Sequence, residues 1–275
     1  MEVDIETIIN KQTNNDNEDS DYSFEEDEND LLATTYLDLN NFDTKDNDYL
    51  IFGTFGNASG FLKVALYDEL KKQPNAFKGK FMQGKVSDKN SPKKLVAEVY
   101  QFKHDTQHSI VILPKESFNK QNYSFISDFF ISTKEKESQV NFKRAIILDS
   151  KYYNEFIKEG DKSSFKEELF CIKNQTQNQV NQLIRCPEIP VFNGISGFSA
   201  YFLQKTDLFN LPAVYYCAAH TEYEVCLTNF KIFEKCAVTY PFFRNKLTSE
   251  KIGEIKVGLS ALLKEFNSYK DSIYS

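Results

Sequence analysis

The sequence predicts an α/β fold with a mixed central sheet and helices on both faces. Residues 49–53, 144–149 and 211–217 are short apolar runs, typical of strands that are buried on both faces. Segments with helical periodicity separate these runs. Because strands that alternate with helices form one sheet between helix layers, we expect a single α/β domain over residues 48–266.

The remaining elements of this domain follow from local patterns. Apolar residues at spacings of three and four predict helices over residues 58–72, 117–130, 194–206, 222–235 and 249–269. The last helix is the most regular, and its apolar face carries Ile252, Ile255, Leu259, Leu262, Leu263 and Phe266. Residues 95–103 and 109–113 predict two strands, and the short polar segment between them suits a β-hairpin.

A different composition marks the two ends of the sequence. Residues 1–48 carry sixteen acidic side chains against two lysines, whereas the rest of the chain carries 24 acidic and 31 basic ones. Like charges repel and sparse apolar residues cannot offset the ordering entropy, so we expect residues 1–47 to be a disordered acidic segment. Residues 267–275 follow the last helix, and we expect them to form a flexible C-terminal docking tail.

The sequence also argues against a targeting segment, a membrane span and a nucleic-acid-binding module. The opening residues Met1-Glu2-Val3-Asp4 are acidic, where a targeting segment is basic and then apolar. Apolar runs are too short to cross a bilayer, and no basic cluster is interleaved with aromatic residues. The five cysteines are odd in number and lie in apolar contexts, which predicts reduced core thiols. We expect a cytoplasmic protein, with the nucleus as a second compartment, that binds neither membranes nor nucleic acid.

Three features of the sequence could indicate catalysis. Residues 53–60 join a strand to a helix as dinucleotide loops do, but their glycine spacing is wrong, so a tight turn is the better interpretation. Asp149 and His220 each follow a buried strand, where α/β folds place ligand sites. Ser196 lacks the G-x-S-x-G context of a nucleophile. No coherent catalytic set results, so we expect neither an enzyme nor a cofactor.

Four residues of the chain could form a zinc site. Cys217, His220, Cys226 and Cys236 are of the residue types that zinc prefers as ligands. However, they contain no C-x-x-C pair, and Cys226 and Cys236 fall within a predicted amphipathic helix. Buried core cysteines are the simpler interpretation, and we expect no metal site.

The last three residues, Ile273-Tyr274-Ser275, suggest docking to another protein. They follow a short polar stretch and combine an apolar side chain, a tyrosine and a carboxylate, which suits capture of a chain end in a pocket. The carboxylate can accept a charge-assisted hydrogen bond from a lysine, and the tyrosine is a typical interface anchor. A frayed tail with an accidental tyrosine is the alternative.

The C-terminal third, residues 193–275, resembles the proteasome assembly chaperone 1 family. The resemblance is carried by the Pro-containing strand 211–217 after an apolar helix, by the long helix after Ser249, and by the terminal segment 271–275. A hydrophobic-Tyr-any (HbYX) terminus is the docking signal of proteasome activators and chaperones. An acidic N-terminal extension also fits.

This resemblance implies a fold related to nucleoside phosphorylases that has no catalytic site, nucleotide or metal. It also implies a heterodimer with the homologous proteasome assembly chaperone 2, which binds the outer face of the ring of proteasome α subunits and promotes its assembly. Ile273 would enter the apolar part of a pocket between adjacent α subunits. Tyr274 would pack on the pocket wall, and the Ser275 carboxylate would meet a lysine.

Two other functions remain as alternatives. A small-molecule-binding or phosphorylase-like α/β enzyme would have its pocket near residues 53–60, Asp149 and His220. A scaffold would instead act through its acidic segment. Phe198 and Phe202 are candidates for the surface that meets a partner chaperone, but core packing is the favoured interpretation for each.

Overall fold

The computed structural model describes residues 34–39, 47–84, 93–131, 140–152, 168–174, 186–189, 194–220, 225–238, 240–244, 246–247 and 264. The chain divides into two units, Met1–Ala33 and Thr34–Ser275, and all the described residues belong to the second. Outside them lie the predicted tail, the predicted helix over 249–269 except for Lys264, and most of the predicted acidic segment.

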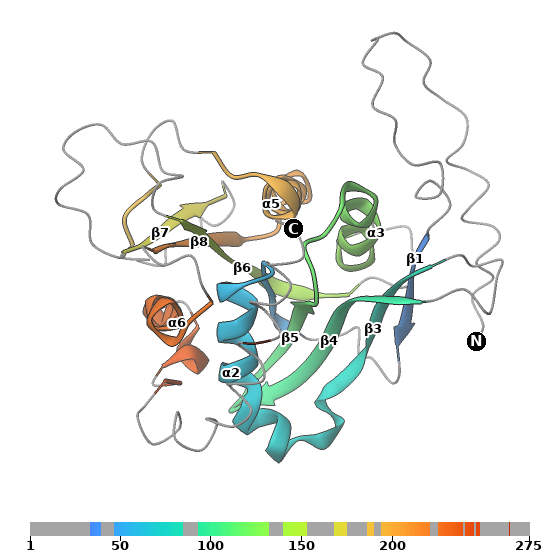
Figure 1. Cartoon of the computed structure of the whole chain (residues 1–275), viewed down its shortest axis with the longest axis horizontal. Helices are drawn as coiled ribbons and strands as arrows, with labels where there is room; N and C mark the ends of the chain where they lie inside the picture. The colour runs from blue at the N-terminus through green and yellow to red at the C-terminus, as the bar shows by residue number, and fades with distance from the viewer. Residues whose placement is uncertain are drawn as a thin grey trace, which may run out of the picture. The chain divides into compact units, whose positions relative to one another are not determined.

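A mixed sheet of eight strands forms the centre of this unit (Figure 1). The strands are β1 (Thr34–Leu39), β2 (Asn47–Gly53), β3 (Phe77–Gly84), β4 (Lys94–His104), β5 (Gln107–Pro114), β6 (Phe142–Tyr152), β7 (Glu168–Lys173) and β8 (Ala213–His220). Across the sheet their order is β1-β3-β4-β5-β2-β6-β8-β7. The neighbouring pairs β5–β2, β2–β6 and β6–β8 are parallel, and the other neighbouring pairs are antiparallel.

The parallel strands occupy the middle of the sheet, as their apolar sequences predict. In β2, Ile51 lies opposite Val111 of β5 on one side and Ile146 of β6 on the other. Every residue of β8 is buried. Strands covered on both faces need no alternation of apolar and polar residues, which explains their continuous apolar runs.

Helices cover both faces of the sheet, which confirms the predicted α/β architecture (Figure 1). The helices are α2 (Asn57–Lys72), α3 (Lys120–Phe130), α5 (Gly197–Leu208) and α6 (Leu227–Phe233). Helices α2 and α6 pack on one face, where Ile146 of the sheet joins the same core as Phe61 and Phe230. Helices α3 and α5 pack on the other, where Ile147 joins Phe202. Consecutive residues of β6 therefore serve opposite cores, as the period of two in a strand requires.

The segment 53–60 contains the tight strand-to-helix turn that the sequence predicts, at residues 54–56 between β2 and α2. Gly56 has a φ of 110°, which a residue with a Cβ rarely adopts. A Cβ on Gly53 would lie 2.7 Å from Leu62 Cδ1, and one on Gly60 would lie 2.6 Å from Phe230 Cζ. These glycines allow α2 to pack closely against β2 and α6, so the turn has a structural reason for its composition.

Three strands were not predicted from the sequence, and one of them corrects a predicted boundary. The 6 residues of β1 lie within residues 1–47 but pair with β3, from Thr34 opposite Gly84 to Leu39 opposite Gly79. The prediction of disorder is therefore wrong for these residues. Strand β3 contains two glycines and two lysines, and β7 is only 6 residues long, so neither gives a strong strand pattern.

Helix ends differ from the predicted ones where local hydrogen bonds decide them. Helix α3 begins at Lys120 because the Asn119 side chain accepts a hydrogen bond from the Asn122 N–H at 3.0 Å. Helix α6 is shorter than predicted and continues as a 3-10 helix over Glu234–Val238. Phe198 and Phe202 of α5 are buried, so they are core residues and not a partner surface. Within the described part of the chain, no helix has the length and apolar character needed to span a bilayer.

Candidate functional site

Two groups of polar side chains lie at opposite ends of the central parallel strands. The carboxyl-end cluster comprises Thr54, Asn57, Asp149, Tyr215 and His220. The amino-end cluster comprises Glu69, Gln73, His104, Ser109 and Tyr240. The carboxyl end is where open α/β sheets usually bind ligands, so its geometry bears directly on the enzyme alternative.

Asp149 is the centre of the carboxyl-end cluster and is 9% exposed. Its Oδ1 accepts hydrogen bonds from the Thr54 hydroxyl at 2.7 Å and from the Ser150 N–H at 2.8 Å. Its Oδ2 accepts from the Tyr215 hydroxyl at 2.9 Å. Burial raises the pKa of Tyr215, and the nearby charge of Asp149 raises it further, so this tyrosine stays neutral and acts as a donor.

Asn57 links His220 to the start of α6. Its Nδ2 lies 3.4 Å from His220 Nε2, and its Oδ1 accepts a hydrogen bond from the Cys226 N–H at 3.3 Å. The asparagine is buried at the first residue of α2, so its carboxamide ties α2, β8 and α6 together. This is a packing role that the tight turn at residues 53–60 makes possible.

In these contacts, the polar side chains that could act in catalysis at this edge of the sheet are bonded to other residues of the fold. Asp149 and His220, which the sequence singles out, lie in two separate sets of contacts and bond to neighbouring elements of the fold. The sequence does not identify their partners Thr54, Asn57 and Tyr215 as site residues, although Thr54 and Asn57 lie in the candidate segment 53–60. The carboxyl-end cluster therefore has a structural role, because its hydrogen bonds hold strands and helices together.

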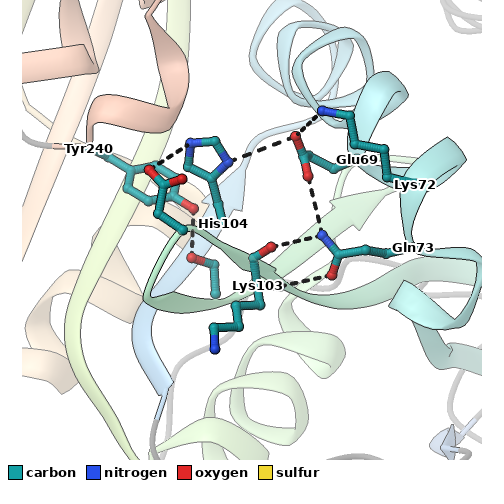
Figure 2. Close-up of polar contacts among 8 residues, drawn as sticks. Glu69, Lys72, Gln73, Lys103, His104 and Tyr240 are labelled. Carbon is teal, nitrogen blue, oxygen red and sulfur yellow. Dashed lines mark hydrogen bonds and ion pairs between the residues drawn. The ribbon is translucent and has the colours of Figure 1, made fainter.

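The amino-end cluster gathers around Glu69, which is 5% exposed near the end of α2 (Figure 2). Its carboxylate lies 3.4 Å from Lys72 Nζ, 3.2 Å from Gln73 Nε2 and 3.8 Å from His104 Nδ1. The Gln73 amide in turn donates to the carbonyl of Lys103 at 2.8 Å and accepts from its N–H at 3.1 Å. These bonds join the end of α2 to the end of β4.

Tyr240, which follows α6 and its 3-10 extension in the chain, is the last member of this cluster. Its hydroxyl lies 2.6 Å from the Ser109 Oγ, and its ring packs against Tyr49 with centroids 4.6 Å apart. Burial raises the pKa of Tyr240 although the Ser109 hydrogen bond opposes this. The segment after α6 is therefore anchored to the starts of β2 and β5.

A cavity of about 440 Å³ lies beside the amino-end cluster. Its lining includes Gln73, Ala76, Lys78, Gln101, Lys103 and His108. Polar and basic groups dominate this lining, whereas small-molecule sites are mostly apolar with a few polar groups that fix the ligand. The cavity therefore does not support the enzyme alternative.

The four residues weighed as zinc ligands do not converge. Cys217 lies in the core under α3 and α5, whereas Cys236 lies in the core under α2 and α6, on the other side of the sheet. Cys226 and His220 both approach Asn57 instead. Within the described ranges, no three or more His, Cys, Asp or Glu side chains are grouped to hold a metal ion. All five cysteines are reduced thiols, and Cys171, Cys217 and Cys236 are buried.

The predicted docking residues Ile273, Tyr274 and Ser275 lie outside the described residues. Their role stays a prediction from the sequence.

Comparison with known proteins finds similarity in structure. No protein-family model matches the chain, and no curated protein sequence does. The fold is similar to that of Pyrococcus furiosus PbaA, described as an archaeal homolog of proteasome-assembly chaperone, with a TM-score of 0.58 and 12% identity. The match covers 86% of this chain and 99% of PbaA.

Two further solved structures share the fold. Pyrococcus furiosus PbaB, described as an archaeal proteasome activator, matches with a TM-score of 0.52 and 12% identity over 88% of this chain and 99% of its own. A protein of unknown function from Thermoplasma acidophilum matches with a TM-score of 0.51 and 10% identity over 84% of this chain and 89% of its own. The chain therefore has the fold of these archaeal proteins.

Proposed function

We propose that this chain is a proteasome assembly chaperone of the chaperone 1 family. It pairs with a homologous second chaperone, proteasome assembly chaperone 2, and binds the ring of proteasome α subunits through Ile273-Tyr274-Ser275. The observation that carries the proposal is the fold shared with PbaA over 99% of that protein. The carboxyl-end cluster supports it, because the polar groups there bond to one another.

The proposed docking follows from the chemistry of the last three residues. Ile273 supplies an apolar side chain and Tyr274 a ring with a hydroxyl, and the proposal takes a free carboxylate on Ser275 as the third contact. A lysine in the receiving pocket would form a charge-assisted bond with that carboxylate. The pocket between adjacent α subunits is the proposed receiver.

Three residues bury little area and lose conformational freedom on binding, so this tail by itself binds weakly. A second tail on the partner chaperone, held by the heterodimer, raises the effective concentration and multiplies the affinity without new contacts. Weak paired anchors also release readily once the ring has matured. The proposal places the protein in the cytoplasm, with the nucleus as a second compartment, which imaging of an N-terminally tagged chain checks.

Affinity purification tests this function. The full chain carries its tag at the N-terminus, so that the Ser275 carboxylate stays free, and mass spectrometry identifies the proteins that co-purify. We expect α-type proteasome subunits and one homologous chaperone. Tyr274→Ala, or one alanine added after Ser275, removes the α subunits and keeps the partner chaperone, whereas the matched control Ser272→Ala keeps both. Recovery of the α subunits with both altered tails would contradict docking through the tail.

A further inference from the structure

Three of the five cysteines gather on the sheet face that α2 and α6 cover. Cys171 of β7 and Cys236 are buried members of that core, and Cys186 packs against it. Of these three, Cys186 is the one that is partly exposed. Cys186 is therefore the residue of the three that an oxidant in solution can approach.

The backbone holds Cys186 next to Cys171. Glu188 lies opposite Cys171 in a parallel bridge beside β7. The Cys171 N–H donates to the Pro187 carbonyl at 2.8 Å, and the Ile189 N–H donates to the Cys171 carbonyl at 3.3 Å. Along an extended segment, residues two apart point to the same side, so Cys186 shares the side of Glu188 and of its bridge partner.

Side-chain contacts agree with this placement. The Cys171 thiol donates to the Cys186 carbonyl at 3.4 Å, and the Cys186 thiol donates to the Leu169 carbonyl at 2.8 Å. The interaction between the two side chains lowers the pKa of Cys171 and, together with burial, raises the pKa of Cys186. Of the two side chains, Cys171 therefore ionises more readily, and the thiolate is the form that attacks sulfur.

We propose that Cys171 and Cys186 form a reversible intramolecular disulfide when the protein meets hydrogen peroxide. Cys186 releases its proton and its sulfur attacks the peroxide to form a sulfenic acid; the O–O bond breaks, and the departing hydroxide takes up that proton and leaves as water. The Cys171 thiolate then attacks the Cys186 sulfur, the S–O bond breaks, and the departing hydroxide takes up the proton that Cys171 released. Two thiols and one peroxide thus give one disulfide and two waters, and a thiol reductant reverses the bond.

Cys236 is the competing partner, and the geometry disfavours it. Both Cys236 and Cys171 are 0% exposed, so an oxidant reaches neither directly. Burial raises the pKa of Cys236 well above its usual range, whereas the pKa of Cys171 is lowered, so Cys171 is the better attacking group of the two. The disulfide with Cys186 instead ties residues 186–189 to the edge strand β7 and closes the chain between them into a loop.

Peptide mapping tests the proposal on the full chain. The reduced protein is treated with hydrogen peroxide, its remaining thiols are blocked, and it is digested with trypsin without reduction. We expect a linked pair of peptides covering residues 167–173 and 186–205, which a reductant separates. Because disulfides that close loops of this length stabilise a fold, we also expect the melting temperature to rise by about 5 °C.

Matched variants separate this pair from general cysteine oxidation. Cys186→Ser removes the linked peptides and the rise in melting temperature. Cys226→Ser keeps both, since Cys226 is also partly exposed but lies beside Asn57. A link between Cys171 and Cys236, links between chains through Cys226, or irreversible oxidation of Cys186 without any link would overturn the proposal. None of these outcomes depends on the proteasome, so the result is independent of the proposed function.

Discussion

The two polar clusters differ in what surrounds their buried carboxylates. Asp149, at the carboxyl end of the parallel strands, accepts hydrogen bonds from neutral donors on the central sheet and the adjoining turn, Thr54 and Tyr215. Glu69, at the amino end, faces the ionisable side chains of Lys72 and His104, which are 69% and 30% exposed. The first carboxylate is fixed by central elements, whereas the second is held by side chains that solvent reaches.

This difference shows that a polar cluster at the usual ligand edge of an α/β sheet can hold the fold together. Buried hydrogen bonds between strands cost much to break, because each orphaned group stays away from water. Partly exposed ion pairs cost less, because solvent screens and replaces them. Substitutions in the two clusters should therefore destabilise the protein by different amounts.

Removal of the central carboxylate should give the largest effect. Asp149→Ala leaves the buried Tyr215 hydroxyl and the Thr54 hydroxyl without their acceptor, and we expect the free energy of unfolding to fall by about 3 kcal/mol. Asp149→Asn keeps one acceptor oxygen and should cost about 1 kcal/mol. Urea unfolding followed by circular dichroism measures both. Equal losses in the two variants would mean that these hydrogen bonds do not hold the cluster.

The matching change at the amino end should cost less. Glu69→Ala removes the contacts to Lys72, Gln73 and His104, and we expect a loss of about 2 kcal/mol in the free energy of unfolding. The control Lys72→Ala should change it by less than about 0.5 kcal/mol, because that side chain is mostly exposed. If Glu69→Ala destabilises the protein more than Asp149→Ala in the same urea series, the contrast between the clusters is wrong.

Substitution of Tyr240 should change the free energy of unfolding least at neutral pH, and its effect should depend on pH above pH 10. Tyr240→Phe removes the hydrogen bond to Ser109 and should cost about 1 kcal/mol at pH 7. The pKa of Tyr240 is raised above the ordinary 10.0, so above pH 10 the unfolded chain loses a proton that the folded protein keeps. Stability contributed by this group is complete below pH 10 and falls as the pH rises further.

Tyr240→Phe should therefore lose stability less steeply than the unaltered protein between about pH 10 and 11.5. Melting temperatures across that range measure the slope. Tyr215 also has a raised pKa, so part of the alkaline loss remains in the variant. Parallel pH curves for the two proteins would show that Tyr240 ionises as readily when folded as when unfolded.

The sequence predicts elements better than contacts. Strands β2, β6 and β8 are predictable because burial on both faces produces apolar runs such as Ile146-Ile147-Leu148. Strand β1 is hidden because it lies in an acidic segment and joins the sheet by backbone pairing with β3. Strand order is not local either, since β2 lies between β5 and β6, which both follow it in the chain.

The same limit applies to the candidate site. Asp149 and His220 are found because each lies near the end of a buried strand. Their partners are 95 residues away at Thr54 and 163 away at Asn57, so no spacing rule identifies them. Tyr215 looks like one more apolar strand residue until the register of β8 on β6 brings its hydroxyl to Asp149.

The central claim is that the carboxyl-end cluster stabilises the folded domain, whereas the last three residues bind the α subunits. One binding measurement tests it. Purified α subunits are titrated with the full chain, with Asp149→Asn and with Tyr274→Ala, while melting temperatures are recorded for each. We expect Tyr274→Ala to weaken binding by about tenfold or more at an unchanged melting temperature. Asp149→Asn should lower the melting temperature and leave the affinity unchanged. Binding that survives Tyr274→Ala but is lost with Asp149→Asn would contradict the account and place recognition in the body.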